Sequence, residues 1–232
     1  MAGTDGTRAG LVGVGAAAAG RAKDWVRRET LPHALLQVAF AALLLSGAVY
    51  FVVRHAVERR LVETHVLTAR ELAIKGNPAD LHAALGELDA LFAQSPDVPV
   101  AHALAADILT ELWVVHRQPG TRVRAEAALA RARALDSRNG ERYAAEALLM
   151  LDGGRVREAD DFLTALERQG ASSPKHLLAR GQTLQALGRI GGARQALERA
   201  AEAGWQDPRY AVAYGEALLD DGRYPQAADA FA

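Results

Sequence analysis

A 34-residue period near the C-terminal end of the sequence is the feature that most constrains its fold. Segments that begin at Pro174 and at Pro208 align at this offset. The aligned pairs are Gly181 with Gly215, Leu184 with Leu218, Gly188 with Gly222, Ala193 with Ala227 and Leu197 with Phe231. A fixed period of about 20–50 residues is typical of a solenoid, in which supersecondary units stack on one another.

Each unit of this period has the pattern of two helices. Leu177, Gly181 and Leu184 are spaced i, i+4 and i+7, which places them on one stripe of a helix. Gly188 suits the left-handed position that ends such a helix. A second apolar stripe begins at Ala193. Since Gly181 and Ala193 are small, the two helices could cross closely there.

These residues resemble the tetratricopeptide repeat (TPR), a 34-residue helix–turn–helix unit with small residues where its helices meet. The resemblance implies an all-α fold, a TPR-like α-solenoid, rather than a generic alanine-rich helical bundle. Three units keep one register, which favours repeats. The residues that match the motif and would pack the repeats are Ala147, Gly154, Ala159, Gly181, Leu184, Gly188, Ala193, Leu197, Gly215, Leu218, Gly222, Ala227 and Phe231.

The repeats lose regularity toward the N-terminus. We expect TPR repeats over residues 140–232, the last one incomplete, and degenerate TPR-like repeats over residues 77–139. Residues 54–76 are expected to be a helical connector and the first repeat helix. A stop and restart follows, because Asn77 can cap a helix and Pro78 suits its first turn.

The unit over residues 106–139 departs most from the repeat pattern. Its first helix is expected within residues 98–116, and the turn around Pro119-Gly120 is enlarged. We still count it as a repeat, because an apolar stripe through Leu129 follows at the expected place.

An uncharged apolar segment, residues 31–53, lies before the repeats. A helix of its 23 residues would span roughly 34 Å, enough for a hydrocarbon core of ~30 Å. A signal peptide would lie nearer Met1 and be shorter. We therefore predict a single N-terminal transmembrane helix, with Pro32 in its first turn.

The residues before this segment, 1–30, are expected to form a flexible basic tail that ends in a juxtamembrane stretch around Trp25. Four positive charges precede the segment and three follow it: Arg21, Lys23, Arg27 and Arg28, then Arg54, Arg59 and Arg60. The positive-inside rule favours a cytoplasmic N-terminus by this one charge. We expect a single-pass protein of a bacterial inner membrane, with the repeats in the periplasm.

Residue patterns for catalysis, metals and nucleic acids are missing from the sequence. The net charge is −1, cysteine is absent, and the seven histidines have no metal-ligand spacing. Acidic neighbours such as Asp160 and Asp161 diverge by about 100° on a helix, so they form no acid–base pair. We expect no cofactor, no metal, no nucleic acid, no small-molecule substrate and no enzymatic activity.

The TPR resemblance implies a concave face, lined by the first helix of each repeat, that holds peptides or partner helices. The candidate partner-binding residues on this face, by matching position, are Glu141, Lys175, Gln182, Gln185, Arg209 and Glu216. Family members that hold a terminal carboxylate use Asn where Gln182 and Glu216 stand, which argues against that subclass. The sequence thus predicts a membrane-anchored scaffold or adaptor for other proteins.

Two alternative functions remain open from the sequence. The chain could be an accessory subunit of a larger membrane complex, held through its transmembrane helix. It could also be the regulatory part of a longer enzyme chain, because Phe231 falls inside a repeat helix and we expect the chain to continue.

Overall fold

The computed structural model describes the backbone of residues 10–231 and the side chains of residues 36–231. All regular secondary structure in this range is helical. The helices are α1 (Gly10–Ile74), α2 (Pro78–Gln94), α3 (Pro99–Val114), α4 (Thr121–Ala134), α5 (Gly140–Asp152), α6 (Val156–Arg168), α7 (Pro174–Ala186), α8 (Ile190–Ala203), α9 (Pro208–Asp220) and α10 (Tyr224–Phe231). The chain divides into two compact units, Met1–Arg59 and Arg60–Ala232.

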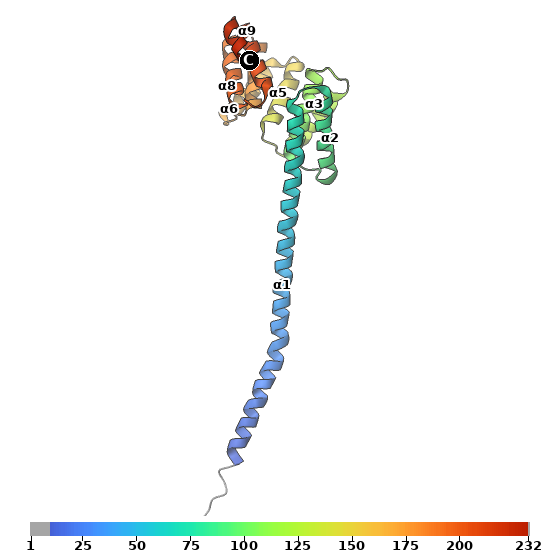
Figure 1. The fold of residues 1–232 in the computed structure, drawn as a ribbon, viewed down its shortest axis with the longest axis vertical. Helices are drawn as coiled ribbons and strands as arrows, with labels where there is room; N and C mark the ends of the chain where they lie inside the picture. Colours follow the sequence, from blue (N-terminus) through green and yellow to red (C-terminus); the bar gives the residue numbers. More distant parts are fainter. Residues whose placement is uncertain (1–9, 232) are drawn as a thin grey trace, which may run out of the picture. The chain divides into compact units, whose positions relative to one another are not determined.

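The first unit contains most of α1, which is one continuous helix (Figure 1). Within residues 36–59 the apolar side chains of α1 are exposed, as at Leu36, which is 71% exposed. The segment Leu36–Ile74 contains a stretch that is long and apolar enough to cross a membrane, and no residue of that stretch is buried against protein. The chain therefore has one candidate membrane span in its described part.

The start of α1 differs from the sequence-based expectation. The helix begins at Gly10, so residues 10–30, expected in a flexible tail, are helical, and Pro32 lies inside α1 rather than in its first turn. Alanine has the highest helix propensity, and the run of alanines at residues 16–19 favours this extension. Residues 1–9 and the side chain of Trp25 lie outside the described part.

The second unit repeats a helix pair with a constant period. Helices α5, α7 and α9 begin 34 residues apart, and so do their partners α6, α8 and α10. The turns within the pairs also repeat, because Gly154, Gly188 and Gly222 have φ angles of 73°, 72° and 73°. This left-handed conformation is strained for residues with a Cβ atom, so these three glycines shape the turns and stay exposed, although they were also predicted as packing residues.

An irregular pair, α3 and α4, precedes the regular ones. Helix α3 lies within the expected range of residues 98–116, and its turn to α4 occupies residues 115–120, against residues 153–155 between α5 and α6. The longer turn reaches the start of α2, where His116 Nε2 lies 2.9 Å from the carbonyl oxygen of Gly76. The enlarged turn predicted from the sequence is confirmed.

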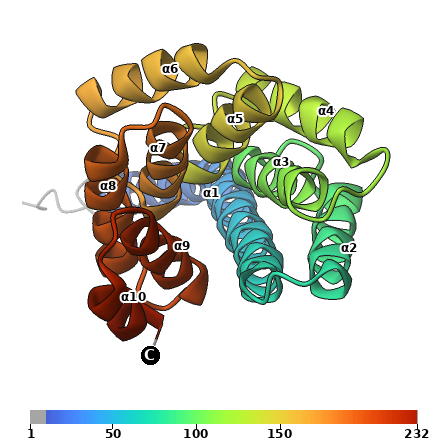
Figure 2. The same cartoon turned by 90° about the horizontal axis from the view of Figure 1, so that it is seen from above.

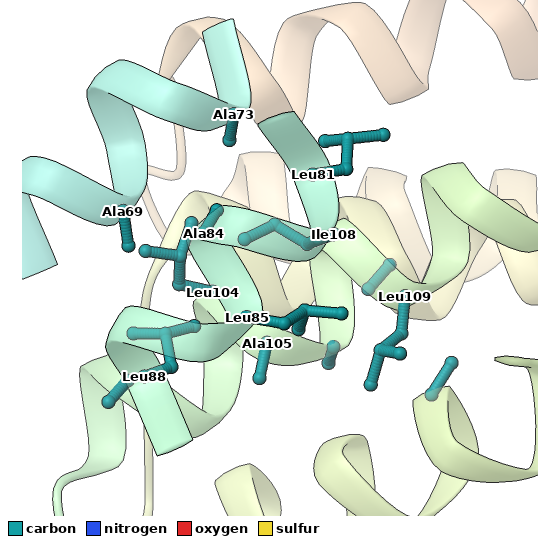
Figure 3. Close-up of a cluster of buried hydrophobic side chains, with 14 of the residues drawn as sticks. Ala69, Ala73, Leu81, Ala84, Leu85, Leu88, Leu104, Ala105, Ile108 and Leu109 are labelled. Carbon is teal, nitrogen blue, oxygen red and sulfur yellow. The ribbon is translucent and has the colours of Figure 1, made fainter. Parts of the chain in front are cut away.

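The last turns of α1 form a repeat-like pair with α2. Asn77 caps α2, since its side chain accepts a 3.0 Å hydrogen bond from the Asp80 backbone amide, and Pro78 is the first helical residue. Small side chains of α1, Ala69 and Ala73, face leucines of α2 and α3 in the largest buried cluster (Figure 3). Residues 60–74 therefore act as the inner helix of this pair.

Small residues set the contact between the helices of each regular pair. A Cβ atom at Gly181 would overlap the Leu197 side chain, and one at Gly215 would overlap Phe231. Ala147 and Leu163, at the same offset in the preceding pair, are both fully buried. Phe231 itself stays 49% exposed, because no described element covers its outer side. The other predicted packing residues that are buried are Ala159, Leu184, Ala193, Leu218 and Ala227.

The helix pairs curve so that the first helix of each pair faces inward. Viewed from above (Figure 2), α3, α5, α7 and α9 lie on the inner side of the curve, and α4, α6 and α8 lie on the outer side. The inner helices therefore form the concave face of the solenoid.

Candidate functional site

The concave face of the second unit contains two adjoining cavities of about 390 and 640 Å³. They share lining residues, so we treat them as one site and call it the groove. The shared residues are Ile74, Asp107, Lys175, Arg209 and Tyr210. Cavities of this size can hold part of a ligand or a short segment of a partner.

A row of charged residues, one from each inner helix, lines the groove. Asp107, Glu141, Lys175 and Arg209 follow one another at intervals of 34 residues on α3, α5, α7 and α9. The first two are acids and the last two are bases. Lys175 Nζ lies 2.8 Å from Asp107 Oδ2. The curvature of the solenoid thus brings α7 against α3, two repeats away.

Arg209 links α9 to α3, three repeats earlier in the chain. Its Nη1 atom lies 2.8 Å from Glu111 Oε2 on α3, and its Nη2 atom lies 2.7 Å from Asp207 Oδ2. Burial alone lowers the pKa of Arg209, but its hydrogen bonds to Asp207 and the charge of Glu111 raise it overall. Burial raises the pKa of Glu111, while Arg209 opposes that increase.

A further ion pair of the row joins α5 to α1. Arg70 Nη2 lies 2.6 Å from Glu141 Oε1, and both residues line the smaller cavity. The charges of this row therefore neutralise one another within the chain, and they hold the inner helices in place.

A second row lies further along the inner helices and has two apolar and two polar members. Val114, Leu148, Gln182 and Glu216 are again 34 residues apart, and all four line the larger cavity. Other apolar lining residues of that cavity are Pro78, Val115, Leu178, Pro208, Val212 and Ala213. This wall can remove apolar side chains of a ligand from water.

The predicted partner-binding residues lie mostly in the groove. Glu141, Lys175, Gln182, Arg209 and Glu216 line it. Gln185 does not line it, and its Nε2 atom donates a 3.1 Å hydrogen bond to Asp220 Oδ2. The structure thus brings five of the six together on one face, whereas their role in partner binding stays a prediction.

Several groove residues were missed by sequence reasoning. Asp107 could have been found by stepping 34 residues back from Glu141. Arg70 and Glu111 carry no such signal, because their partners lie on distant helices. Tyr210 also lines both cavities, and burial together with the charge of Asp207 raises the pKa of its hydroxyl.

The groove offers binding chemistry. Its row of acids and bases is paired, and no group of three or more His, Asp or Glu residues in the described part of the chain could hold a metal ion. Outside the groove, Asp160 pairs with Arg180 and Arg189 rather than with Asp161. The arrangement combines an apolar wall with a few hydrogen-bonding groups, which is typical of a binding site.

No protein-family model and no curated protein matches the chain. Solved helical-repeat structures do resemble it. The solenoid is TPR-like. Pseudomonas aeruginosa PilF is 16% identical, with a TM-score of 0.47 over 75% of this chain and 76% of PilF. TTC0263, a thermophilic TPR protein of Thermus thermophilus, is 22% identical, with a TM-score of 0.44 over 60% of this chain and 73% of its own.

A third structure is YrrB, described as a TPR protein with an unusual peptide-binding site. It is 14% identical, with a TM-score of 0.38 over 72% of this chain and 80% of YrrB. At these low sequence identities, the similarity concerns the helical-repeat fold alone.

Proposed function

We propose that the chain is a membrane-anchored scaffold or adaptor without enzymatic activity, which binds a segment of another protein in the groove. The observation that carries this proposal is the groove itself, an open site lined by five inner helices with an apolar wall. An exposed apolar wall on the concave side of a solenoid is costly unless a ligand covers it.

The exposed apolar surface of α1 supports the membrane anchor. Side chains such as Phe40 and Phe51 have no protein cover in the described part of the chain, and a bilayer would bury them. In this proposal residues 31–53 cross a bacterial inner membrane once, with the repeats on the periplasmic side.

Recruitment is the mechanism that follows from these two parts. The anchor would confine the groove to the membrane surface, which raises the effective concentration of partners in the same membrane. The apolar wall would provide most of the affinity, and the polar groups at its edge would fix the position of the bound segment.

A pull-down from detergent-solubilised membranes tests the proposal with the full-length chain. Val212→Glu places a charge on the groove wall, where Val212 is 46% exposed. Val123→Glu is the matched control, because Val123 is 70% exposed on the outer helix α4. We expect the wild type and the control to retain the same partner and Val212→Glu to lose it.

Retention of one partner by all three chains would contradict groove binding. It would instead favour the alternative of an accessory subunit held through its membrane helix. Replacing residues 31–53 with an unrelated transmembrane helix would then remove the partner.

A further inference from the structure

The groove has one lining acid, Glu216, that the chain itself does not neutralise. Glu216 and Asp220 lie one turn apart on α9, so they share a face of that helix. Neither forms an ion pair with any residue of the described part of the chain, although Asp220 accepts a hydrogen bond from Gln185. The acids of the charged row, in contrast, each contact a cation.

A hydrogen-bond acceptor without a donor belongs to another residue of the same cavity, Gln182. The Oε1 atom of Gln182 is buried and accepts no hydrogen bond. Gln182 precedes Glu216 by one repeat, and both line the larger cavity. Buried polar groups are nearly always paired in folded proteins, so this oxygen would gain a partner if the Gln182 side chain turned toward a donor on a ligand.

The bases of the groove are not available to an anionic ligand. Lys175 contacts Asp107, and Arg209 contacts Glu111 and Asp207. The other two lining bases are also paired, Arg70 with Glu141 and Lys75 with Asp80 at the rim. An acidic ligand that displaced these contacts would leave partly buried carboxylates without a cation, which is unfavourable. The free charge at the groove is therefore negative, beside an apolar wall.

We propose that the groove binds an apolar protein segment that carries one lysine or arginine, with this cation placed at Glu216. The inference deepens the proposed function and depends on it. Apolar side chains of the segment would cover Leu178 and Val212, and its cation would donate to Glu216 and to Gln182.

Peptide binding to the full-length chain in lipid nanodiscs tests the inference. Three fluorescein-labelled peptides share one alanine–leucine core and differ only at a central position, which is lysine, norleucine or glutamate. We expect the lysine peptide to bind about threefold more tightly than the norleucine peptide in fluorescence anisotropy, because an ion pair with the exposed carboxylate of Glu216 adds a modest amount of affinity. The glutamate peptide should bind most weakly.

Two variants assign this preference to Glu216. Glu216→Gln should reduce the preference for lysine, and Glu216→Lys should reverse it in favour of the glutamate peptide. Asp161→Asn is the control, because Asp161 is exposed on the outer helix α6. The peptide preference of this variant should match that of the wild type.

Equal binding of the lysine and norleucine peptides, binding of none of them, or a lysine preference unchanged by both Glu216 variants would overturn the inference. These outcomes are distinct from failure of the proposed function. If Val212→Glu abolishes partner retention while the peptides show no lysine preference, groove binding stands and only the cationic character of the segment is refuted.

Discussion

Single residues decide how closely the helices of a pair approach, as Gly181 illustrates. A Cβ atom there would overlap Leu197, whereas one at Gly86 on α2 would meet no atom within 4 Å. We expect Gly181→Ala to lower the free energy of unfolding by about 1–3 kcal/mol, because the packed core must shift. Gly86→Ala should raise it by about 0.5–1 kcal/mol through helix propensity. Urea unfolding followed by circular dichroism measures both, and equal effects would contradict this packing.

We expect His176 to make the stability of the chain depend on pH. Its side chain is fully buried, neither ring nitrogen has a hydrogen-bond partner, and Nε2 lies 3.7 Å from Glu167 Oε1. Burial lowers its pKa, more than the charge of Glu167 raises it, while Arg180 and Arg199 lower it further. The folded chain thus favours the neutral form of His176. The contribution of this residue to stability is fully present above the pKa of an unfolded histidine, 6.5, and is lost as the pH falls below that value.

Replacing this histidine should reduce that dependence. We expect the free energy of unfolding of the wild type to fall between about pH 7 and about pH 5 more steeply than that of His176→Leu, which has no proton to bind there. Urea titrations at several pH values compare the two slopes. Parallel slopes would show that His176 does not contribute.

Helices and turns, the next scale up, were the most predictable part of the chain. The repeated positions of Gly188 and Gly222 predicted the period and the turns, because glycine adopts the left-handed conformation of these turns without strain. The start of α1 was not predictable in this way, since a segment rich in both glycine and alanine fits a tail as well as a helix.

The turn glycines allow a test at the same scale. Gly188 has a φ of 72°, whereas Gly191, three residues later in α8, has a helical backbone and open space around it. Gly188→Ala should cost about 1–2 kcal/mol of unfolding free energy, because alanine is strained in the left-handed region. Gly191→Ala should be neutral or stabilising in the same denaturation experiment. A Gly188→Ala protein as stable as the wild type would contradict this role.

The curvature of the solenoid belongs to the second unit as a whole, and long-range ion pairs stabilise it. Arg209 and Glu111 are 98 residues apart in sequence, and Lys175 and Asp107 are two repeats apart. Local sequence patterns indicate which helix faces the groove, but they do not encode which side chains meet across it. For this reason five groove residues were anticipated, whereas Arg70 and Glu111 were not.

A double-mutant cycle measures how much the ion pair between Arg209 and Glu111 contributes to the stability of the solenoid. Arg209→Met should destabilise the chain by about 1–3 kcal/mol, because Glu111 and Asp207 lose their cation while partly buried. Adding Glu111→Gln should recover part of that loss, so the two effects should be non-additive. Additive effects would show that the pair does not couple α9 to α3.

The central claim, that the groove receives a partner at the membrane, is tested most directly by site-specific photo-crosslinking in intact membranes. A photoreactive amino acid replaces Val212 on the groove wall in one full-length chain and Val123 on the outer helix α4 in another. We predict a discrete protein adduct from position 212, competed by the lysine peptide, and none from position 123. Adducts of the same protein from both positions, or from position 123 alone, would contradict the claim.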